Sequence, residues 1–456
     1  MKPRPMLLAW LSFAVLCPVL NISGHFIYPP ELMLYAAATL RILRGARRAR
    51  GENTEALKGA RKLLRSFTRA QFVYALLFFL AAALSAWLAD QEVGNYDLFV
   101  LRNILQVGLA LLVFGDKADA LEHRGRLDRA IFAALIVLCI PALIVYLQRL
   151  DLFSMRSLVS QLYKPQFFFL GERQFASYRY TSVFKDFFTA AVYFTLLSGF
   201  LFYFCLRTKL RAGYRYALVF MLAFVYTAQL FVARTSLLVI PFLLAAIALA
   251  GVKMNAQMLL RRLLPTAVLA AIVAAIALPQ LLGGGLVNSK WAMEGLAVFS
   301  SDDRDAPSSF TVMQNWYEQM YEQAFEGRFS LLTPHHAYDL TERNDPGRYT
   351  DSFYGQELYR YGIYGAVAYF AYLALLAIPA LKTNRTALIL VIALAVMNYK
   401  GGNTFFMPKT LYLYALILAL TPYIENRRPN AWRRSASSPL SSPILPSAEV
   451  SSRAAS

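Results

Sequence analysis

The sequence has few cysteines and few charged residues, and each scarcity excludes a class of protein. Only 3 of its 456 residues are cysteine, and all three lie inside apolar runs: Cys17, Cys139 and Cys205. A free thiol in such a run behaves as a small hydrophobic side chain, and no disulfide framework or metal-ligand spacing is visible. Charged residues make up 16% of the chain and hydrophobic residues 58%, which excludes a single soluble core and indicates a membrane protein.

Apolar runs long enough to cross a bilayer recur along nearly the whole sequence. As a helix, a run of about 20 residues spans ~30 Å of hydrocarbon. The runs therefore predict an all-α polytopic membrane protein with about twelve transmembrane helices. They cover residues 6–22, 27–42, 71–89, 98–115, 130–147, 187–206, 216–233, 236–252, 265–282, 361–381, 386–399 and 404–423. The first run is kept as a spanning helix because no small-residue cleavage site follows it.

The net charge of +19 is distributed in a way that indicates membrane orientation. Lysine and arginine cluster on every second connection between the runs, most densely within residues 41–69. This alternation is the positive-inside pattern, and it places both termini and these connections in the cytoplasm. Membrane orientation explains the basic residues, so we expect no nucleic acid as a partner.

The lengths of the connections divide the chain into six parts. Two outward connections are long, and the last residues are rich in serine, proline and alanine, which is typical of disorder. The parts are transmembrane helices 1 to 5 (1–147), a basic outward loop (148–186), helices 6 to 9 (187–282), a large outward loop (283–360), helices 10 to 12 (361–423) and a disordered cytoplasmic tail (424–456).

Basic residues at the outer membrane level need a separate reason, because the positive-inside pattern does not explain them. They are Arg102, Arg149, Arg156, Lys164, Arg173, Arg179, Lys185, Arg234, Lys400 and Lys409. One explanation is that they extend to lipid headgroups or pair with loop carboxylates. The other is that they bind an anion, since arginine is well shaped for bidentate contact with phosphate.

Four of these cations are our candidates for binding a phosphate or pyrophosphate. Arg234 lies in "ARTSLL", a very short turn between two apolar runs. Arg179 lies in "YRYTSVFKD", which leads into a helix whose free N–H groups would also favour an anion. Arg173 and Lys400, in the basic loop and the last hairpin, complete the predicted set.

The large outward loop contains aromatic candidates for binding sugar. Residues 310–325, "FTVMQNWYEQMYEQAF", have the spacing of an amphipathic helix. Trp316 and Tyr317 either stack on sugar rings or lie against the membrane interface. Tyr354, further along, is assigned to the sugar as well. His335 and Asp339 are four residues apart but lack a clear third ligand, so no metal is expected.

Residues 347–370, "GRYTDSFYGQELYRYGIYGAVAYF", contain the candidates for proton transfer. Asp351 is the first candidate, with helix N-capping as its competing role, and Glu357 is the second. An acidic box about ten residues before "YGIYG" at the entry of a membrane helix resembles the O-antigen polymerase and O-antigen ligase family. "ARTSLL", "YTSVFKD" and the order of these motifs extend the resemblance over residues 165–423.

The resemblance is closer to polymerases than to ligases. Ligases of the family usually have histidine where this chain has Asp351, although the spaced Arg/Gly repeats of some polymerases do not appear cleanly. It implies a multi-pass protein of the bacterial inner membrane whose outward loops are periplasmic. The implied activity is polymerisation of polyprenyl-pyrophosphate-linked oligosaccharide units into O-antigen or exopolysaccharide, by metal-independent, inverting glycosyl transfer without a cofactor.

The resemblance also sets the expected partners and the alternatives. The lipid-linked oligosaccharide and the bilayer are the expected partners, and a chain-length regulator protein is left open. An O-antigen ligase that transfers glycan to lipid A-core is the first alternative. A flippase or transporter of the lipid-linked oligosaccharide is the second, and it would require charged residues deep inside several helices.

Overall fold

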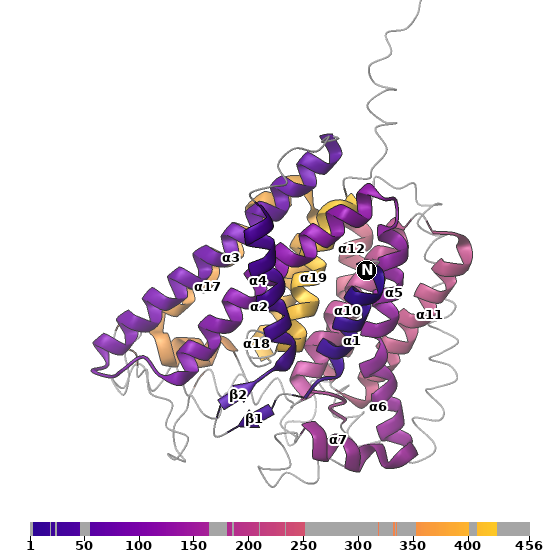
Figure 1. The fold of residues 1–456 in the computed structure, drawn as a ribbon. Coiled ribbons are helices and arrows are strands. Elements are labelled where there is room, and N and C mark those ends of the chain that lie inside the picture. The colour runs from indigo at the N-terminus through magenta and orange to yellow at the C-terminus, as the bar shows by residue number, and fades with distance from the viewer. Residues whose placement is uncertain are drawn as a thin grey trace, which may run out of the picture.

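The protein is a bundle of helices with one short β-hairpin (Figure 1). The structure is a computed structural model that describes residues 3–18, 20–22, 25–45, 55–163, 180–184, 187–208, 210–232, 234–250, 318, 332, 334, 353–400 and 408–425. The longer helices are α1 (Pro3–Leu16), α2 (Pro29–Gly45), α3 (Glu55–Leu88), α4 (Asn95–His123), α5 (Leu127–Leu138), α6 (Ile140–Leu150), α7 (Met155–Tyr163), α10 (Phe187–Arg207), α11 (Ala212–Ala228), α12 (Arg234–Ala250), α17 (Phe353–Thr383), α18 (Arg385–Lys400) and α19 (Pro408–Glu425).

Four short elements complete the described chain. Strand β1 (Leu20–Ile22) pairs antiparallel with β2 (His25–Ile27), and single 3₁₀ turns form η1 (Leu152–Ser154) and η2 (Gln229–Phe231). The strands are not evident in the sequence, because three residues are too few to show an alternating pattern. The predicted basic loop 148–186 begins with the end of α6 and then α7, so its first part is helical.

Six helical stretches among the described residues are long and apolar enough to cross a membrane, counting α5 with α6 and α11 with η2 as one stretch each. They are Lys58–Leu88, Asn95–His123, Leu127–Leu150, Phe187–Arg207, Ala212–Phe231 and Glu357–Leu381. Each contains one of the predicted runs almost completely, so the all-helical membrane class is confirmed. Helices α1, α2, α12, α18 and α19 coincide with five further runs. The count of twelve spans and the large loop stay predictions, because 265–282, most of 283–352 and the tail beyond 425 lie outside the described residues.

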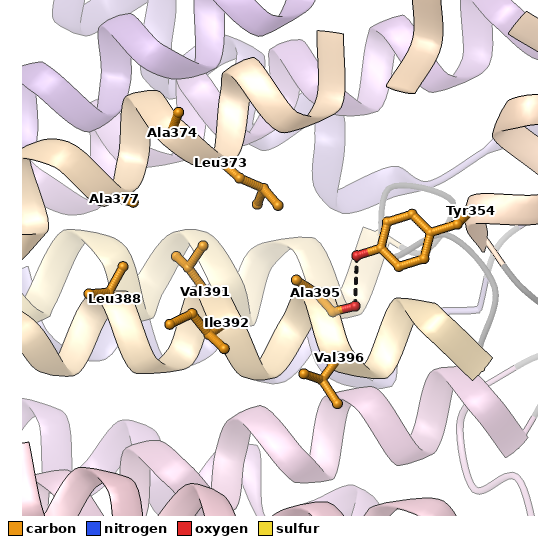
Figure 2. Close-up of a pocket in the computed structure, with 9 residues that line it drawn as sticks. All are labelled: Tyr354, Leu373, Ala374, Ala377, Leu388, Val391, Ile392, Ala395 and Val396. Carbon is orange, nitrogen blue, oxygen red and sulfur yellow. Dashed lines mark hydrogen bonds between the residues drawn. The ribbon is translucent and has the colours of Figure 1, made fainter. Parts of the chain in front are cut away.

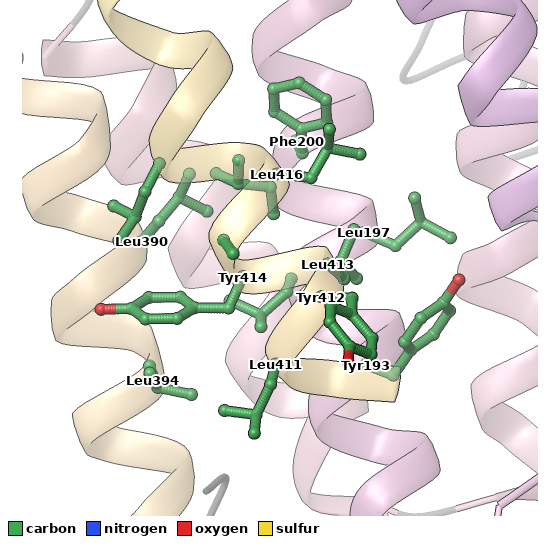
Figure 3. Packing of buried hydrophobic residues seen from close by; sticks show 14 of the residues in the cluster. Tyr193, Leu197, Phe200, Leu390, Leu394, Leu411, Tyr412, Leu413, Tyr414 and Leu416 are labelled. Carbon is green, nitrogen blue, oxygen red and sulfur yellow. The ribbon is translucent and has the colours of Figure 1, made fainter. Parts of the chain in front are cut away.

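Helix α19 lies at the centre of the bundle. Every residue from Lys409 to Glu425 is buried, which is the pattern of a helix enclosed on all sides. It packs against α3, α4, α10 and α18. Figure 3 shows Leu411, Leu413 and Leu416 of α19 with Leu197 of α10 and Leu394 of α18 around it.

The helix ends gather at two ends of the bundle. One end, here called the hairpin end, contains β1, β2, α7, the last turn of α3 and the first turns of α4, α17 and α19 (lower in Figure 1). The opposite end contains the ion pairs Arg41–Asp116, Arg61–Asp119 and Arg207–Glu425. The connections predicted to face outward therefore share the hairpin end wherever they are described.

Candidate functional site

A buried segment without helical structure, Tyr180–Phe184, lies at the hairpin end. All five of its residues are buried. Its backbone is fixed by α6, because Ser182 N donates to Gln148 Oε1 at 2.9 Å and Ser182 Oγ donates to the carbonyl of Pro141 at 2.7 Å. Ser182 also has a φ of +53°, which few residues other than glycine adopt. So many fixed contacts hold the segment in one conformation.

This segment is joined to the turn that precedes α12. The backbone N–H of Tyr180 donates to the carbonyl of Phe231 at 2.9 Å, and Phe231 is the last residue of η2. Arg179 directly precedes Tyr180 in the chain, and Arg234 is the first residue of α12. The backbone hydrogen bond therefore places Tyr180, inside the predicted segment "YRYTSVFKD", against the turn that leads into "ARTSLL".

Lys409, in the first turn of α19, binds the same segment from the other side. Its Nζ donates to the carbonyl of Val183 at 2.7 Å and lies 4.5 Å from the centroid of the Tyr163 ring. Lys409 is only 7% exposed. Within the described ranges no carboxylate forms an ion pair with it, which is an unusual state for a buried ammonium group.

Tyr163 of α7 does not neutralise this lysine. Its hydroxyl donates to the carbonyl of Leu16 at 2.5 Å. Burial raises the pKa of Tyr163 to about 12, so the phenol stays protonated and uncharged at neutral pH. Lys409 therefore meets an aromatic face and a carbonyl at this position, and no carboxylate of the described residues lies in an ion pair with it.

Two buried hydroxyl groups lie close to Lys409 in the chain, and a third belongs to the Tyr180–Phe184 segment that Lys409 contacts. In the described part of the protein, Thr181 Oγ1, Thr410 Oγ1 and Tyr412 Oη are buried without a hydrogen-bond partner. Thr410 follows Lys409, Tyr412 lies one turn further along α19, and Thr181 is two residues before Val183. Buried polar atoms are nearly always paired in native proteins, so these hydroxyls could be satisfied by a bound ligand.

Arg156 of α7 supports the segment at Tyr180. Its Nε donates to the carbonyl of Gln148 at 2.8 Å, and one Nη donates to the Tyr180 hydroxyl at 3.2 Å. Arg156 is one of the outward cations, but it was not among the predicted site residues. The contact between Arg156 and Gln148 is predictable from their spacing of eight residues. The contact between Arg156 and Tyr180 depends on tertiary structure and is not.

A second group of polar residues, the Asp97 cluster, joins α3, α4 and α17 at the hairpin end. It consists of Ser85, Tyr96, Asp97, Arg360 and Tyr361. The Tyr361 hydroxyl donates to Asp97 Oδ1 at 2.5 Å, and Arg360 Nε lies 3.8 Å from the same oxygen. The Arg360 guanidinium lies 3.5 Å from the centroid of the Tyr96 ring, and Ser85 Oγ donates to the Arg360 carbonyl at 2.8 Å. The cluster fastens the first part of α17 to two neighbouring helices.

Glu357, the second candidate for proton transfer, lies beside the Asp97 cluster. It is one helical turn before Arg360 and Tyr361, on the same side of α17, and only 5% of it is exposed. A carboxylate this deeply buried has little access to an acceptor sugar. Asp351, the first candidate, lies outside the described residues, two positions before α17 begins.

The α17 helix is broken just after this cluster. Gly362 has a φ of +60° and a ψ of −150°, a conformation that is essentially restricted to glycine. The predicted apolar run 361–381 begins one residue before the break. The first part of α17, Phe353–Tyr361, is therefore separated by this break from the rest of the helix.

An apolar groove of about 540 Å³ runs between α17 and α18 (Figure 2). Its lining is Tyr354, Leu373, Ala374, Ala377, Leu388, Val391, Ile392, Ala395 and Val396. Tyr354, predicted to bind sugar, lies at one end of the groove, where its hydroxyl donates to the carbonyl of Ala395 at 2.8 Å. Its ring stacks on Phe370 with centroids 6.2 Å apart. Tyr354 thus closes the end of the groove nearest the hairpin end.

The remaining predicted site residues are only partly placed by the structure. Lys400 is the last residue of α18, while Arg173, Arg179, Trp316 and Tyr317 lie outside the described residues, as do His335 and Asp339. Over the described ranges, no three histidine, cysteine, aspartate or glutamate residues form a group that could hold a metal ion.

No family model, curated protein or solved structure matches this chain.

Proposed function

We propose that the protein is a bacterial inner-membrane glycosyltransferase. In this proposal it polymerises polyprenyl-pyrophosphate-linked oligosaccharide units at the periplasmic face, as the motif resemblance implies. The observation that carries the proposal is the contact of Lys409 with Val183. Lys409 belongs to the last outward hairpin, and the segment of Val183 is bonded to the turn before Arg234. Three segments chosen for their outward cations thus meet at one place.

A cation at the place where Lys409 lies suits a diphosphate leaving group. When the bond between the anomeric carbon and the pyrophosphate oxygen breaks, negative charge grows on that oxygen. A fixed cation in a region of low dielectric stabilises this charge more than it stabilises the ground state. We assign this role to Lys409, together with Arg179, Arg234 and Arg173. Lys400, at the end of α18, belongs with the three arginines to the set predicted from the sequence and is assigned the same role.

The other half of the reaction needs a base. The acceptor hydroxyl attacks the anomeric carbon from the face opposite the pyrophosphate and transfers its proton to a carboxylate as the new carbon–oxygen bond forms. We assign the base to Asp351, because Glu357 is buried beside Arg360. Attack from the opposite face inverts the anomeric centre.

The groove between α17 and α18 suits the lipid part of the same substrate. Apart from Tyr354, its lining is entirely apolar, and it lies along a candidate membrane-spanning helix. A polyprenyl chain is a long apolar molecule that gains free energy from burial along such a surface. In the proposal, the chain lies in this groove while the sugar and pyrophosphate stay at the hairpin end.

The positions of the buried charges favour a transferase over a flippase. Among the described residues, the buried charged residues are Glu31, Asp97, Glu357, Lys409 and Glu425. The first four lie at the hairpin end, and Glu425 lies at the opposite end with Arg207. A flippase that moves a pyrophosphate through the bilayer is expected to place charged groups along the whole route, including the middle.

The test is an assay of the purified full chain with a lipid-linked oligosaccharide unit and no added metal. A ladder of polymer on a gel supports polymerisation. Transfer of single units to added lipid A-core identifies a ligase, and movement of the unaltered substrate across a vesicle membrane identifies a flippase. Either of these results without a ladder would overturn the proposal.

The catalytic assignment has its own arm in this assay. Asp351→Asn should abolish the ladder without changing the amount of protein in the membrane. Asp339→Asn, in the same predicted loop, is the matched control and should keep activity. A fully active Asp351→Asn protein would exclude the base role while leaving the transferase proposal intact.

A further inference from the structure

One face of α3 is exposed along its length, and it changes from basic to apolar side chains between Arg69 and Phe72. Its first part has four exposed cations spaced by four, three and four residues, which places them in one row on the helix: Lys58, Lys62, Arg65 and Arg69. We call this row the basic stripe. The same face continues with exposed apolar side chains: Phe72, Val73, Leu76, Phe79, Leu80, Leu84 and Trp87.

The apolar part of this face has the length of a bilayer core. From Arg69 to Trp87 the helix rises about 27 Å, close to the ~30 Å of hydrocarbon in a membrane. Trp87 is 75% exposed, and exposed tryptophans are typical of the membrane–water interface. We therefore expect Arg69 and Trp87 at the two interfaces and the face between them against lipid.

The basic stripe differs from the cations on the inner side of the bundle. Arg61 forms a bidentate pair with Asp119 at 2.7 and 3.0 Å, and Arg41 pairs with Asp116. Both acids belong to α4. In the part of the chain that the structure describes, none of the four residues of the basic stripe forms an ion pair with a carboxylate. Protein acids thus compensate the inward cations, whereas the stripe points its charge toward the lipid side.

We propose that the basic stripe is a binding site for the headgroups of anionic phospholipids. Its cations continue a lipid-facing surface beyond the hydrocarbon, which is the level of the headgroup phosphates. Long lysine and arginine side chains can keep their apolar stems along the helix while the charged groups reach these phosphates. An anionic membrane surface attracts such cations over roughly one Debye length, so Lys58 and Lys62 contribute although they lie further from the core. The inference is independent of the glycosyltransferase proposal.

The experiment measures lipid preference with the purified full chain in an uncharged detergent. Phosphatidylglycerol and phosphatidylcholine are titrated separately, and bound lipids are counted by native mass spectrometry. The wild-type protein should bind phosphatidylglycerol in preference, and 0.5 M salt should weaken this preference by screening. The variant with Lys58→Gln, Lys62→Gln, Arg65→Gln and Arg69→Gln should lose about ten-fold or more in apparent affinity for phosphatidylglycerol.

A control variant removes the same charge elsewhere. Arg124→Gln, Arg126→Gln, Arg129→Gln and Arg211→Gln neutralise four exposed cations that do not form a row on one helix. This control should keep most of the preference. The proposal is overturned if the stripe variant keeps its preference for phosphatidylglycerol, or if the control loses it equally. Far-ultraviolet circular dichroism verifies that both variants keep their helices.

Discussion

The hydroxyl of Tyr361 donates a hydrogen bond of 2.5 Å to Oδ1 of Asp97, joining α17 to the first turn of α4. Asp97 Oδ2 also accepts from the backbone N–H of Gly94 at 2.8 Å, so both carboxylate oxygens are occupied. The Asp97 side chain therefore binds the last residue before α4, Gly94, and also binds Tyr361, which directly precedes the break at Gly362. Loss of its charge should affect both.

Asp97→Asn should destabilise the protein by about 1 to 3 kcal/mol. The substitution removes the negative charge near the Arg360 guanidinium, which is 12% exposed, and replaces an acceptor oxygen with an NH₂ group. Unfolding of the purified protein in mixed micelles, followed by circular dichroism, measures the change in free energy. Asp116→Asn is the matched control in the same helix, because Asp116 is 51% exposed in its pair with Arg41. An exposed pair contributes little, so equal losses from the two substitutions would contradict the role of the Asp97 cluster.

Gly362→Ala should destabilise the protein by about 1 to 3 kcal/mol through backbone strain alone. A Cβ atom is strongly disfavoured at a φ of +60° and a ψ of −150°. The measurement is the same unfolding experiment. Gly213→Ala is the control, since a Cβ atom there would meet no atom within 4 Å and alanine favours the helix. If Gly362→Ala left the free energy of unfolding unchanged, α17 could form a regular helix at residue 362.

The spanning helices were predictable because hydrocarbon imposes a simple requirement. A helix such as α10 must be apolar over about 20 residues, and this requirement appears directly as a run in the sequence. Small breaks within helices were harder to predict. The first glycine of "YGIYG", Gly362, has a φ of +60°. The sequence gives no local signal for this conformation, because glycine is also common inside membrane helices.

The candidate site was predictable in part. Outward cations were found because they depart from the positive-inside pattern, and this selected the segment that contains Arg179. Lys409 was counted among these cations, but Lys400 of the same hairpin was chosen for the site. The contact of Lys409 with Val183 could not be predicted, because it joins residues 226 positions apart. The Asp97 cluster was missed for the same reason. Asp97 and Ser85 appear in the sequence as ordinary helix-end residues, and their common partner lies far away in α17.

Lys409→Met should abolish polymer formation without loss of stability. This prediction rests on the proposed function. Burial of an ammonium group without a carboxylate partner among the described residues is costly, so an apolar side chain of similar length should leave the free energy of unfolding unchanged or raise it by about 1 kcal/mol. Activity and unfolding are measured on the same preparation. Lys117→Met is the control. Lys117 is a half-buried lysine near the C-terminal end of α4, at the end of the bundle opposite to Lys409, and its loss should leave the ladder unchanged. If Lys409→Met kept full activity, Lys409 would have no part in binding the diphosphate.

Ala374→Phe should impair the use of substrates with long polyprenyl chains, because the new ring would fill part of the groove between α17 and α18 (Figure 2). Displacing only two CH₂ groups of the chain from an apolar surface costs about 1.6 kcal/mol, so KM should rise roughly ten-fold. Val367→Phe is the control, since Val367 is 60% exposed on the same helix but does not line the groove. A substrate with a short isoprenoid chain should show little difference between Ala374→Phe and wild type, because it leaves most of the groove empty in both. Equal impairment with long and short chains would place the lipid elsewhere and assign Ala374 to helix packing instead.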